Sequence, residues 1–406
     1  MRVIYIHQYF RTPEQGGAVR SYHLAKGLVE KGIEVELITA HNQPNYDQNW
    51  IDGIKIHYLP VFYDQKFGFL KRTWAFLDFV RKSKSLLQKL NRPDLLYITS
   101  TPLTTGLIGL WAKKKMALPY IFEVRDLWPE APIQVGAIQN PLLIGYLRGL
   151  EKKIYQNALR LVALSPGIGA HLTQTCSNKE VALIPNFSDL NRFFPQEKNQ
   201  ELKKSLGLSE GLTIAYTGAI GLVNAVDELL DLAKIAQEKG KNWNFLIMGE
   251  GSHRKPLEEK ARELQLNFVR FLPFSSKDQV NQVLSLADFC WISFAHFPVL
   301  KTNSPNKFFD ALAAGKAILV NHKGWVYDLV KTHHLGITML PGKWDKAFAK
   351  LEHLESHREE ITQMEKMSRK LAETYFSKDL AVSRLAEILQ PQPKLTQGGE
   401  ADIRTA

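Results

Sequence analysis

Residues 184–195 read IPNFSDLNRFFP, and this short stretch of prolines and turn-forming residues divides the chain into two parts. On either side of it, short apolar segments alternate with amphipathic segments of helical spacing. Strands that alternate with helices in this way predict parallel sheets covered on both faces. Because the alternation starts again after the break, we expect two α/β domains, at 1–190 and 191–376, rather than one large sheet. The polar end of the chain, 391–406, contains proline and glycine and predicts a flexible tail.

The expected strands are short apolar runs, and most are followed by a loop with glycine or polar residues. In the first part they are Arg2–Ile6, Glu34–Thr39, Ile54–Leu59, Leu95–Thr99, Tyr120–Val124 and Leu159–Leu164. In the second part they are Leu212–Tyr216, Phe245–Met248, Phe268–Phe271, Phe289–Ile292 and Ala317–Val320. Open α/β sheets bind ligands beyond the carboxyl ends of their strands. We therefore expect the functional residues in the loops that follow these strands.

The composition is that of a soluble globular protein, with 406 residues of which 45% are hydrophobic and 23% charged. No apolar run reaches the ~18 to 20 residues needed to span a bilayer. The N-terminal MRVIYIHQYF lacks the pattern of a signal peptide. The two cysteines, Cys176 and Cys290, cannot form a disulfide framework or a four-ligand zinc site. These features favour a cytoplasmic protein.

The positive charge is concentrated in the first part of the chain. The net charge is +11, of which residues 1–190 carry +8. Its densest stretch is 66–90, KFGFLKRTWAFLDFVRKSKSLLQKL, where basic side chains alternate with aromatic ones and Asp78 is the one acid. A basic helix with aromatics on another face can lie on an anionic membrane. Alternatively, its apolar side packs on its own sheet and the lysines are solvated. A nucleic-acid partner is not expected, since no recognition motif accompanies the charge.

Three glycine loops follow expected strands and are candidates for binding a phosphate or a sugar. They are Gly16-Gly17, the loop from Gly218 to Gly221, and Gly249-Glu250-Gly251. Without side chains the backbone can approach a ligand closely, and the start of the following helix favours an anion. The alternative is that these loops are ordinary turns. None of them is GxGxxG, so a nicotinamide cofactor gains no support.

The segment SPNKFFDALAAGKAILVN, which begins at Ser304, predicts a helix followed by a strand. Ser304 or Asn306 can cap this helix, and Pro305 fits its first turn. Lys307 also falls in the first turn, where the helix dipole disfavours a cation, and a bound phosphate would relieve that conflict. Asp310 lies on the same face and could hold ribose hydroxyls. The alternative is a surface ion pair between Lys307 and Asp310.

The segment EVRDLWPEAP, residues 123–132, places charges at the end of an apolar strand. Arg125, Asp126 and Glu130 surround Trp128, and such polar loops at strand ends are often functional. Motifs for other chemistries are missing from the sequence. It contains no HExxH, no Asp-x-Asp and no GxxxxGK[ST], so we expect no metal and no P-loop enzyme.

Several of these segments together resemble one family. The quoted stretches YIHQYFRTPEQGGAVRSYHLAKGLVEKGIEVELIT, LIPNFSDLNRFFP, YTGAIG, IMGEG, VRFLPF and SPNKFFDALAAGKAILV are similar, in this order, to blocks of the retaining family-4 glycosyltransferases with the GT-B fold. The resemblance covers residues 1 to about 376. It implies two Rossmann-like domains facing across a cleft, an acceptor domain and then a nucleotide-sugar donor domain. A C-terminal helix, 377–390, should cross back to the first domain.

The sequences of two segments indicate a subgroup of this family. EVRDLWPEAP and SPNK are similar to enzymes that transfer amino sugars, often fucosamine-like, to polyprenyl-diphosphate-linked glycans in O-antigen or capsule assembly. The resemblance implies a UDP-sugar donor, no cofactor, and a peripheral position on the inner face of the plasma membrane, with 66–90 against the anionic surface.

Some positions that carry functional residues in the family have other residues in this chain. Asp310 occupies the place of the family's ribose-binding acid, but Thr302 stands where the family has the glutamate that contacts the donor sugar. Ala219 and Asn224 stand where the family usually has an arginine and a lysine for the diphosphate. Lys307 remains. The backbone amides of 303–306 can substitute for the missing glutamate.

The missing positive charge could come from Arg20 or Arg125. Gly249, Glu250, Gly251 and the backbone up to Phe274 match the region near the nucleotide base, while Arg125 and Asp126 are expected to face the sugar or the acceptor. In this scheme Lys307 and the amides of the Gly16 and Gly218 loops stabilise the leaving diphosphate. Two alternatives stay open: a nucleotide-sugar 2-epimerase on the same fold, and a nucleotide- or lipid-binding module that has lost catalysis.

Overall fold

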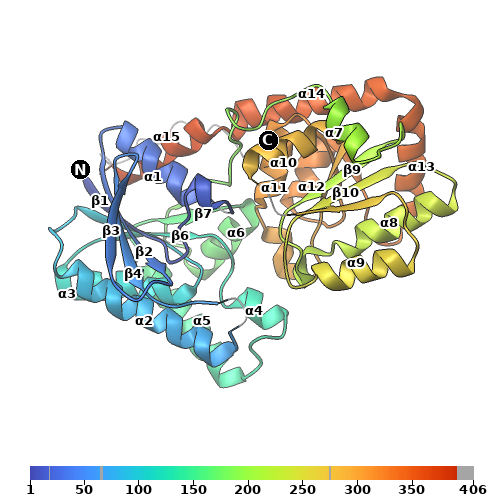
Figure 1. The fold of residues 1–406 in the computed structure, drawn as a ribbon. Helices are drawn as coiled ribbons and strands as arrows, with labels where there is room; N and C mark the ends of the chain where they lie inside the picture. The colour runs from blue at the N-terminus through green and yellow to red at the C-terminus, as the bar shows by residue number, and fades with distance from the viewer. Residues whose placement is uncertain (18, 65–66, 274–275, 391–406) are drawn as a thin grey trace. The chain divides into compact units, whose positions relative to one another are not determined.

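The computed structural model describes residues 1–17, 19–64, 67–273 and 276–390, and the chain forms two compact units. Unit 1 contains Met1–Pro185, Phe297–Asn303 and the segment that begins at Asp379. Unit 2 contains Asn186–His296 and Ser304–Lys378. Each unit is an α/β structure built around one largely parallel sheet (Figure 1). The α/β fold class expected from the sequence is therefore confirmed.

The sheet of unit 1 has eight strands among the described residues, in the order β3-β4-β2-β1-β5-β6-β7-β8. All neighbouring strands are parallel except β3 and β4, which form an antiparallel hairpin. The central strands β1, β5 and β6 are buried on both faces, which explains their unbroken apolar sequences. The strands are β1 (Arg2–Ile6), β2 (Glu34–His41), β3 (Asp47–Ile51), β4 (Ile54–Pro60), β5 (Leu95–Thr99), β6 (Tyr120–Val124), β7 (Leu161–Ala163) and β8 (Val181–Leu183).

Helices cover both faces of this sheet. In Figure 1, α2, α3 and α5 run along one face, and α1 and α15 lie on the opposite side. Helices α1 and α15 pack closely, because a Cβ added at Gly27 would lie 2.4 Å from a methyl carbon of Val382. The helices are α1 (Arg20–Glu30), α2 (Phe69–Leu87), α3 (Gly106–Met116), α4 (Glu130–Gln134), α5 (Pro141–Asn157), α6 (Pro166–Thr175) and α15 (Lys378–Leu389).

Unit 2 has a six-stranded parallel sheet in the part that the structure describes, with the order β11-β10-β9-β12-β13-β14. Side chains alternate along its strands, so Ile214 and Tyr216 face one hydrophobic cluster and Ala215 the other. The strands are β9 (Thr213–Thr217), β10 (Asn244–Met248), β11 (Val269–Leu272), β12 (Phe289–Ile292), β13 (Ala317–Val320) and β14 (Gly336–Thr338).

The helices of unit 2 divide between these two clusters. Helices α8 (Asp227–Glu238), α9 (Arg254–Glu263) and α13 (Trp344–Ser356) pack on the face of Ile214 and Tyr216. Helices α10 (Lys277–Leu286), α11 (Asn306–Ala313) and α12 (Trp325–Thr332) pack on the other face. Helix α14 (Arg358–Tyr375) contributes to both clusters, and the short helix α7 (Gln200–Ser205) precedes β9.

Each sheet has a point at which the order of its strands reverses. In unit 1 the chain builds outward from β1 through β2 and then, from β5, in the opposite direction. In unit 2 the same reversal separates β9 from β12. Open α/β sheets bind ligands beyond the carboxyl ends of the strands at this point. The loops after β1, β5 and β6, and those after β9, β12 and β13, are therefore the places to look for a site.

One segment of the second half of the chain packs with unit 1, which no sequence pattern predicts. The 3-10 turn η4 (Pro298–Thr302) belongs to unit 1, although it lies between β12 and α11 of unit 2 along the chain. Within unit 1 the backbone N–H of Val299 donates to Oε1 of Gln134 at 2.8 Å. The carbonyl oxygen of Thr302 accepts from the Ser165 hydroxyl at 2.5 Å. The chain therefore passes from unit 2 into unit 1 at Phe297 and returns to unit 2 at Ser304.

Within the described ranges, no helix combines the length and hydropathy that crossing a bilayer would require.

Candidate functional site

The amino group of Lys307 lies at the strand reversal of unit 2. Lys307 is the second residue of α11, and its Nζ donates to the Tyr216 hydroxyl on β9 at 3.0 Å. Nζ is also 3.5 Å from the carbonyl oxygen of Ser293, which follows β12. The rings of Tyr216 and Phe294 approach the ammonium group, with their centroids at 4.3 and 5.1 Å. Lys307 thus connects the carboxyl ends of the two strands that flank the reversal.

The surroundings of Lys307 oppose its charge. Burial lowers the pKa of its ammonium group to about 7. The first turn of a helix carries partial positive charge, which disfavours a second cation there. The described contacts of Nζ are a hydroxyl, a carbonyl oxygen and two aromatic rings, and none of these described groups is a carboxylate. An anion bound beside Lys307 would restore the positive charge that burial removes.

The glycines after β9 and β10 are explained by the packing of two loops. The backbone N–H of Gly218 donates to Met248 O, and that of Ile220 to Glu250 O, each at 2.9 Å. Gly249 has φ +153°, and a Cβ on it would lie 1.8 Å from the Gly218 carbonyl oxygen. A Cβ on Gly251 would lie 2.1 Å from the oxygen of Ile220. These two glycines therefore allow close backbone contact between the loops. Gly221 has φ −120°, and its N–H donates to Asn224 Oδ1.

The prediction that Ser304 or Asn306 caps α11 is wrong. Pro305 occupies the N-cap position, and no side chain of the described residues caps the helix there. Ser304 is buried and its hydroxyl instead accepts from the backbone N–H of Asn186 at 3.2 Å. Asn306 and Lys307 do begin the helix, as expected. Asp310 follows one turn later on the same helix and is partly exposed.

Glu250 is exposed and lies in an ion pair. Its carboxylate accepts from Arg254 Nη1 at 2.7 Å, and the same nitrogen donates to Gly249 O. Arg254 thus fixes the loop after β10. Phe274, the last residue of the expected base-binding region, lies outside the described residues.

A polar network next to Lys307 was missed by the sequence interpretation. Asn321, directly after β13, donates to Glu228 Oε2 at 3.0 Å and accepts from the N–H of Phe294 at 3.0 Å. Glu228 also pairs with His296 at 2.8 Å. Burial, together with the charges of Lys307 and His296, lowers the pKa of His322 to about 3, so this ring is neutral. In the sequence, this network was indicated only by the position of Asn321 and His322 directly after a buried strand.

The positions where the family has other residues have local roles. The carbonyl oxygen of Ala219 accepts from the Tyr216 hydroxyl at 2.5 Å. Asn224 holds the loop after β9, because its side chain accepts from Gly221 N and its carbonyl oxygen accepts from Ser293 Oγ. Thr302 lies in unit 1, against Gly167.

In unit 1, Arg20 is buried and bonded within the fold, whereas the sequence interpretation expected it to supply charge to the donor diphosphate. Its side chain is 1% exposed and donates to Glu123 Oε1 at 2.8 and 3.0 Å. It also donates to the carbonyl oxygens of Ile184 and Pro185. These contacts join α1, β6 and the last residues of the segment Met1–Pro185, so Arg20 is engaged inside the fold. Gly16 and Gly17 precede α1 with φ +68° and +84°, which explains glycine at both positions.

Arg125 and Asp126 lie beyond the carboxyl end of β6, as expected. Arg125 Nη1 is 3.2 Å from Nε2 of His7, which follows β1. Asp126 accepts from the Thr101 hydroxyl at 3.4 Å, and burial raises its pKa. The structure thus brings together residues that follow β1, β5 and β6. His7 and Thr101 were missed, because nothing in the sequence tells which strands are neighbours.

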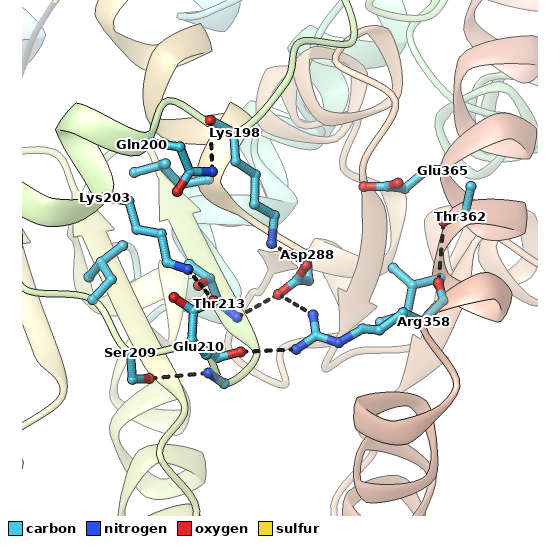
Figure 2. Close-up of a pocket in the computed structure, with 14 residues that line it drawn as sticks. Lys198, Gln200, Lys203, Ser209, Glu210, Thr213, Asp288, Arg358, Thr362 and Glu365 are labelled. Atoms are coloured by element: carbon cyan, nitrogen blue, oxygen red, sulfur yellow. Dashed lines mark hydrogen bonds and ion pairs between the residues drawn. The ribbon is translucent and has the colours of Figure 1, made fainter.

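The large cavity of unit 2 lies at the other edge of the sheet. It has a volume of about 510 Å³ and includes Thr213, at the start of β9, and Asp288, just before β12. Figure 2 shows Lys198 and Arg358 pointing toward Asp288, which they approach to 2.6 and 3.0 Å. Because its charges are paired and it lies at the amino ends of the strands, we do not assign it to the reaction. Among the described residues, no group of three His, Cys, Asp or Glu side chains is arranged to hold a metal ion.

The fold defines a class of protein with two Rossmann-like α/β domains, and in this chain a buried lysine lies beyond the carboxyl ends of the second sheet. Residues 15–186 match the family described as glycosyl transferase 4-like domain, and residues 198–371 match glycosyl transferases group 1. The chain is thus a glycosyltransferase that carries the domains of family 4.

Two relatives match most of the chain. Alpha-monoglucosyldiacylglycerol synthase of Streptococcus pneumoniae is 24% identical over 369 residues, which is 87% of this chain and 78% of that protein. One component of the human phosphatidylinositol N-acetylglucosaminyltransferase is 25% identical over 289 residues, which is 68% of this chain and 54% of that protein.

Solved structures are similar over nearly the whole length. Sucrose-phosphate synthase from Thermosynechococcus elongatus has a TM-score of 0.77 at 17% identity, and the match covers 95% of this chain and 98% of that one. The Anabaena protein HepE, solved with UDP-glucose, has a TM-score of 0.71 at 16% identity, with 96% and 99% covered. These similarities establish the GT-B fold.

Proposed function

We propose that the protein is a retaining, metal-independent glycosyltransferase that uses a nucleotide sugar, with UDP favoured, and that unit 2 binds the donor. The observation that carries the proposal is the position of Lys307, at the start of α11 and beyond the carboxyl ends of β9 and β12. A nucleoside diphosphate is the kind of ligand that this arrangement favours, because a helix start and a cation both attract phosphate.

The proposed reaction requires no dedicated carboxylate nucleophile on the protein. Departure of the nucleoside diphosphate places negative charge on its outer phosphate while the sugar becomes cationic. Lys307 and the start of α11 stabilise that charge in the transition state. The amides of the glycine loop contribute little, because the N–H groups of Gly218, Ile220 and Gly221 already donate within the fold. Asp310, on the same helix, holds ribose hydroxyls, and Glu250 lies near the nucleoside. In a same-face displacement the leaving phosphate itself takes the proton of the acceptor hydroxyl.

For the acceptor we propose a polyprenyl-diphosphate-linked glycan, and for the sugar an N-acetyl amino sugar, as in surface polysaccharide synthesis. The names of both relatives include a lipid, and one includes N-acetylglucosamine. Helix α2 supports a position on the inner face of the membrane, because Leu70 and Trp74 are 81% and 73% exposed on a basic helix. An apolar surface of this kind, beside lysines and arginines, is suited to an anionic bilayer.

A second candidate is a nucleotide-binding module that has lost catalysis. It is favoured by Thr302, which replaces the family's glutamate and packs within unit 1 against Gly167. Asn224, in place of a cation, holds a loop instead of a phosphate.

One experiment separates these functions. Thermal shifts with nucleoside diphosphates and nucleotide sugars identify the donor, and transfer is then measured with a prenyl-diphosphate-linked sugar. Stabilisation by UDP together with transfer supports the proposal. Stabilisation without transfer to any acceptor favours the binding module. Conversion of the nucleotide sugar without net release of nucleotide, with or without acceptor, favours a 2-epimerase. A protein that responds to no nucleotide would rule out donor binding in unit 2.

A further inference from the structure

His7 and Arg125 lie together at the carboxyl edge of the unit 1 sheet. His7 follows the last residue of β1, Arg125 follows β6, and Arg125 Nη1 is 3.2 Å from His7 Nε2. Only β5 separates these two strands in the sheet. The pair therefore spans the point where the strand order reverses, which is where such sheets bind ligands.

The contact determines which nitrogen of His7 carries the proton. A guanidinium group only donates hydrogen bonds, so Nε2 accepts and the neutral ring carries its hydrogen on Nδ1. His7 is 4% exposed, and Nδ1 has no hydrogen-bond partner among the described residues. Burial and the charge of Arg125 hold the pKa of His7 well below its ordinary value. The sheet edge thus presents a buried N–H donor without an acceptor, which a bound ligand would explain.

The charge of Arg125 is available to an anion. In the part of the chain that the structure describes, the hydrogen-bond partner of its side chain is the neutral ring of His7. The described hydrogen bonds of the neighbouring carboxylates are with other residues. Glu123 accepts from Arg20, and Asp126 accepts from a threonine hydroxyl.

The N-terminus of α1 adds to the positive potential that Arg125 creates at this edge of the sheet. Arg20, its first residue, bonds Glu123, which precedes Arg125 by two residues. None of the described side chains caps this helix N-terminus. Its first backbone N–H groups and the helix dipole therefore favour an anion at the same edge of the sheet.

We propose that Arg125 and His7 form a phosphate site in unit 1 that binds the acceptor, with His7 positioning the guanidinium and donating through Nδ1. This inference rests on the proposed function, because it names the part of the acceptor that unit 1 recognises. A guanidinium beside a second N–H donor matches the oxygens of a phosphate better than a neutral sugar. A donor diphosphate has the same chemistry, but unit 2 has its own cation for it, Lys307.

Inorganic pyrophosphate tests the site without turnover. Full-length protein with nitrogen-labelled histidine is first saturated with UDP and then titrated with pyrophosphate, and the His7 signal is assigned from its loss in His7→Asn. We expect the Nδ1 resonance of His7 to shift, and the Kd of pyrophosphate to rise about tenfold in Arg125→Gln. Arg92→Gln, a change at an exposed arginine of unit 1, is the matched control. A His7 resonance that does not move, or equal affinity in Arg125→Gln and wild type, overturns the proposal.

Kinetics distinguish the two sources of phosphate. A prenyl-diphosphate-linked N-acetylhexosamine is compared with an alkyl glycoside of the same sugar that has no phosphate. We expect Arg125→Gln and His7→Asn to raise KM for the diphosphate acceptor about tenfold more than for the alkyl glycoside. Equal rises for both acceptors overturn the phosphate assignment, and an equal rise in the Kd of UDP assigns the site to the donor instead. If wild-type protein binds no UDP, the proposed function fails, and the pyrophosphate titration still decides the site.

Discussion

The amino group of Lys307 donates to the hydroxyl of Tyr216 at 3.0 Å, and that hydroxyl donates in turn to Ala219 O at 2.5 Å. Two hydrogen bonds thus join the start of α11 to the glycine loop after β9. Burial raises the pKa of Tyr216, so its hydroxyl keeps its proton and Lys307 supplies the charge at this point. The position of Lys307 is therefore defined before any ligand arrives, as electrostatic stabilisation of a leaving group requires.

Lys307→Met should weaken UDP binding and make it independent of the protonation of this site. The pKa of Lys307 is lowered to about 7 in the free protein, so above that pH the binding of an anion must bring a proton with it. Affinity for UDP in the wild type should then fall up to about tenfold for each pH unit above 7. Calorimetry in buffers of different ionisation enthalpy measures both the affinity and the proton uptake.

Lys331→Met, at an exposed lysine on α12, is the control and should behave like wild type. The slope of the wild type is compared with that of Lys307→Met, which removes the titration of UDP itself from the result. Identical pH slopes in the two proteins would show that Lys307 does not contact the diphosphate.

The strands that carry the site were predictable because they are buried on both faces. Leu95–Thr99, Tyr120–Val124, Phe289–Ile292 and Ala317–Val320 have the bounds that their apolar runs predict. Strand β3 was missed because DQNWI is polar and lies at the exposed edge of the sheet. Strands β8 and β14, of three residues each, are too short to show a pattern.

The site itself was predictable only where the residues are next to each other in sequence. Lys307 and the glycine loops follow strands directly, so their positions could be inferred. Tyr216 reads as a core residue within an apolar strand, and its role appears only when α11 is placed beside β9. The approach of Thr302 to Gly167 depends on tertiary contacts far apart in sequence.

Gly249→Ala should destabilise unit 2 and abolish UDP binding. The added Cβ would lie 1.8 Å from the Gly218 carbonyl oxygen, and the backbone has φ +153°. The two loops must then separate, at a cost of more than about 2 kcal/mol. Gly240→Ala is the matched control, because Gly240 also has positive φ (+68°) but nothing lies within 4 Å of its added Cβ. It should lose only about 1 kcal/mol and keep its affinity. Urea unfolding measures both, and equal losses would contradict the close contact.

Arg20→Met should destabilise unit 1 rather than specifically impair donor binding. Removing the guanidinium leaves the buried carboxylate of Glu123 without its cation, which costs about 3 to 5 kcal/mol. The double variant Arg20→Met/Glu123→Leu should recover part of this loss, since no charge remains buried. Urea unfolding gives the values, with Arg11→Met, at an exposed arginine, as the control. If Arg20→Met unfolds like wild type but binds UDP poorly, Arg20 belongs to the donor site after all.

Trp74→Ala should weaken binding to anionic vesicles about tenfold, because a large side chain that is 73% exposed on α2 would no longer enter the bilayer interface. Trp50→Ala is the matched control: Trp50 is 63% exposed but lies on the edge strand β3 and not on the basic helix. Flotation with vesicles that contain or lack anionic lipid measures both contributions. We expect wild-type protein to float only with anionic lipid, and Trp50→Ala to float with it. If Trp74→Ala floats as well as Trp50→Ala, the exposed face of α2 does not bind the membrane. If wild-type protein floats equally with neutral vesicles, the basic side chains of 66–90 do not contribute to that binding.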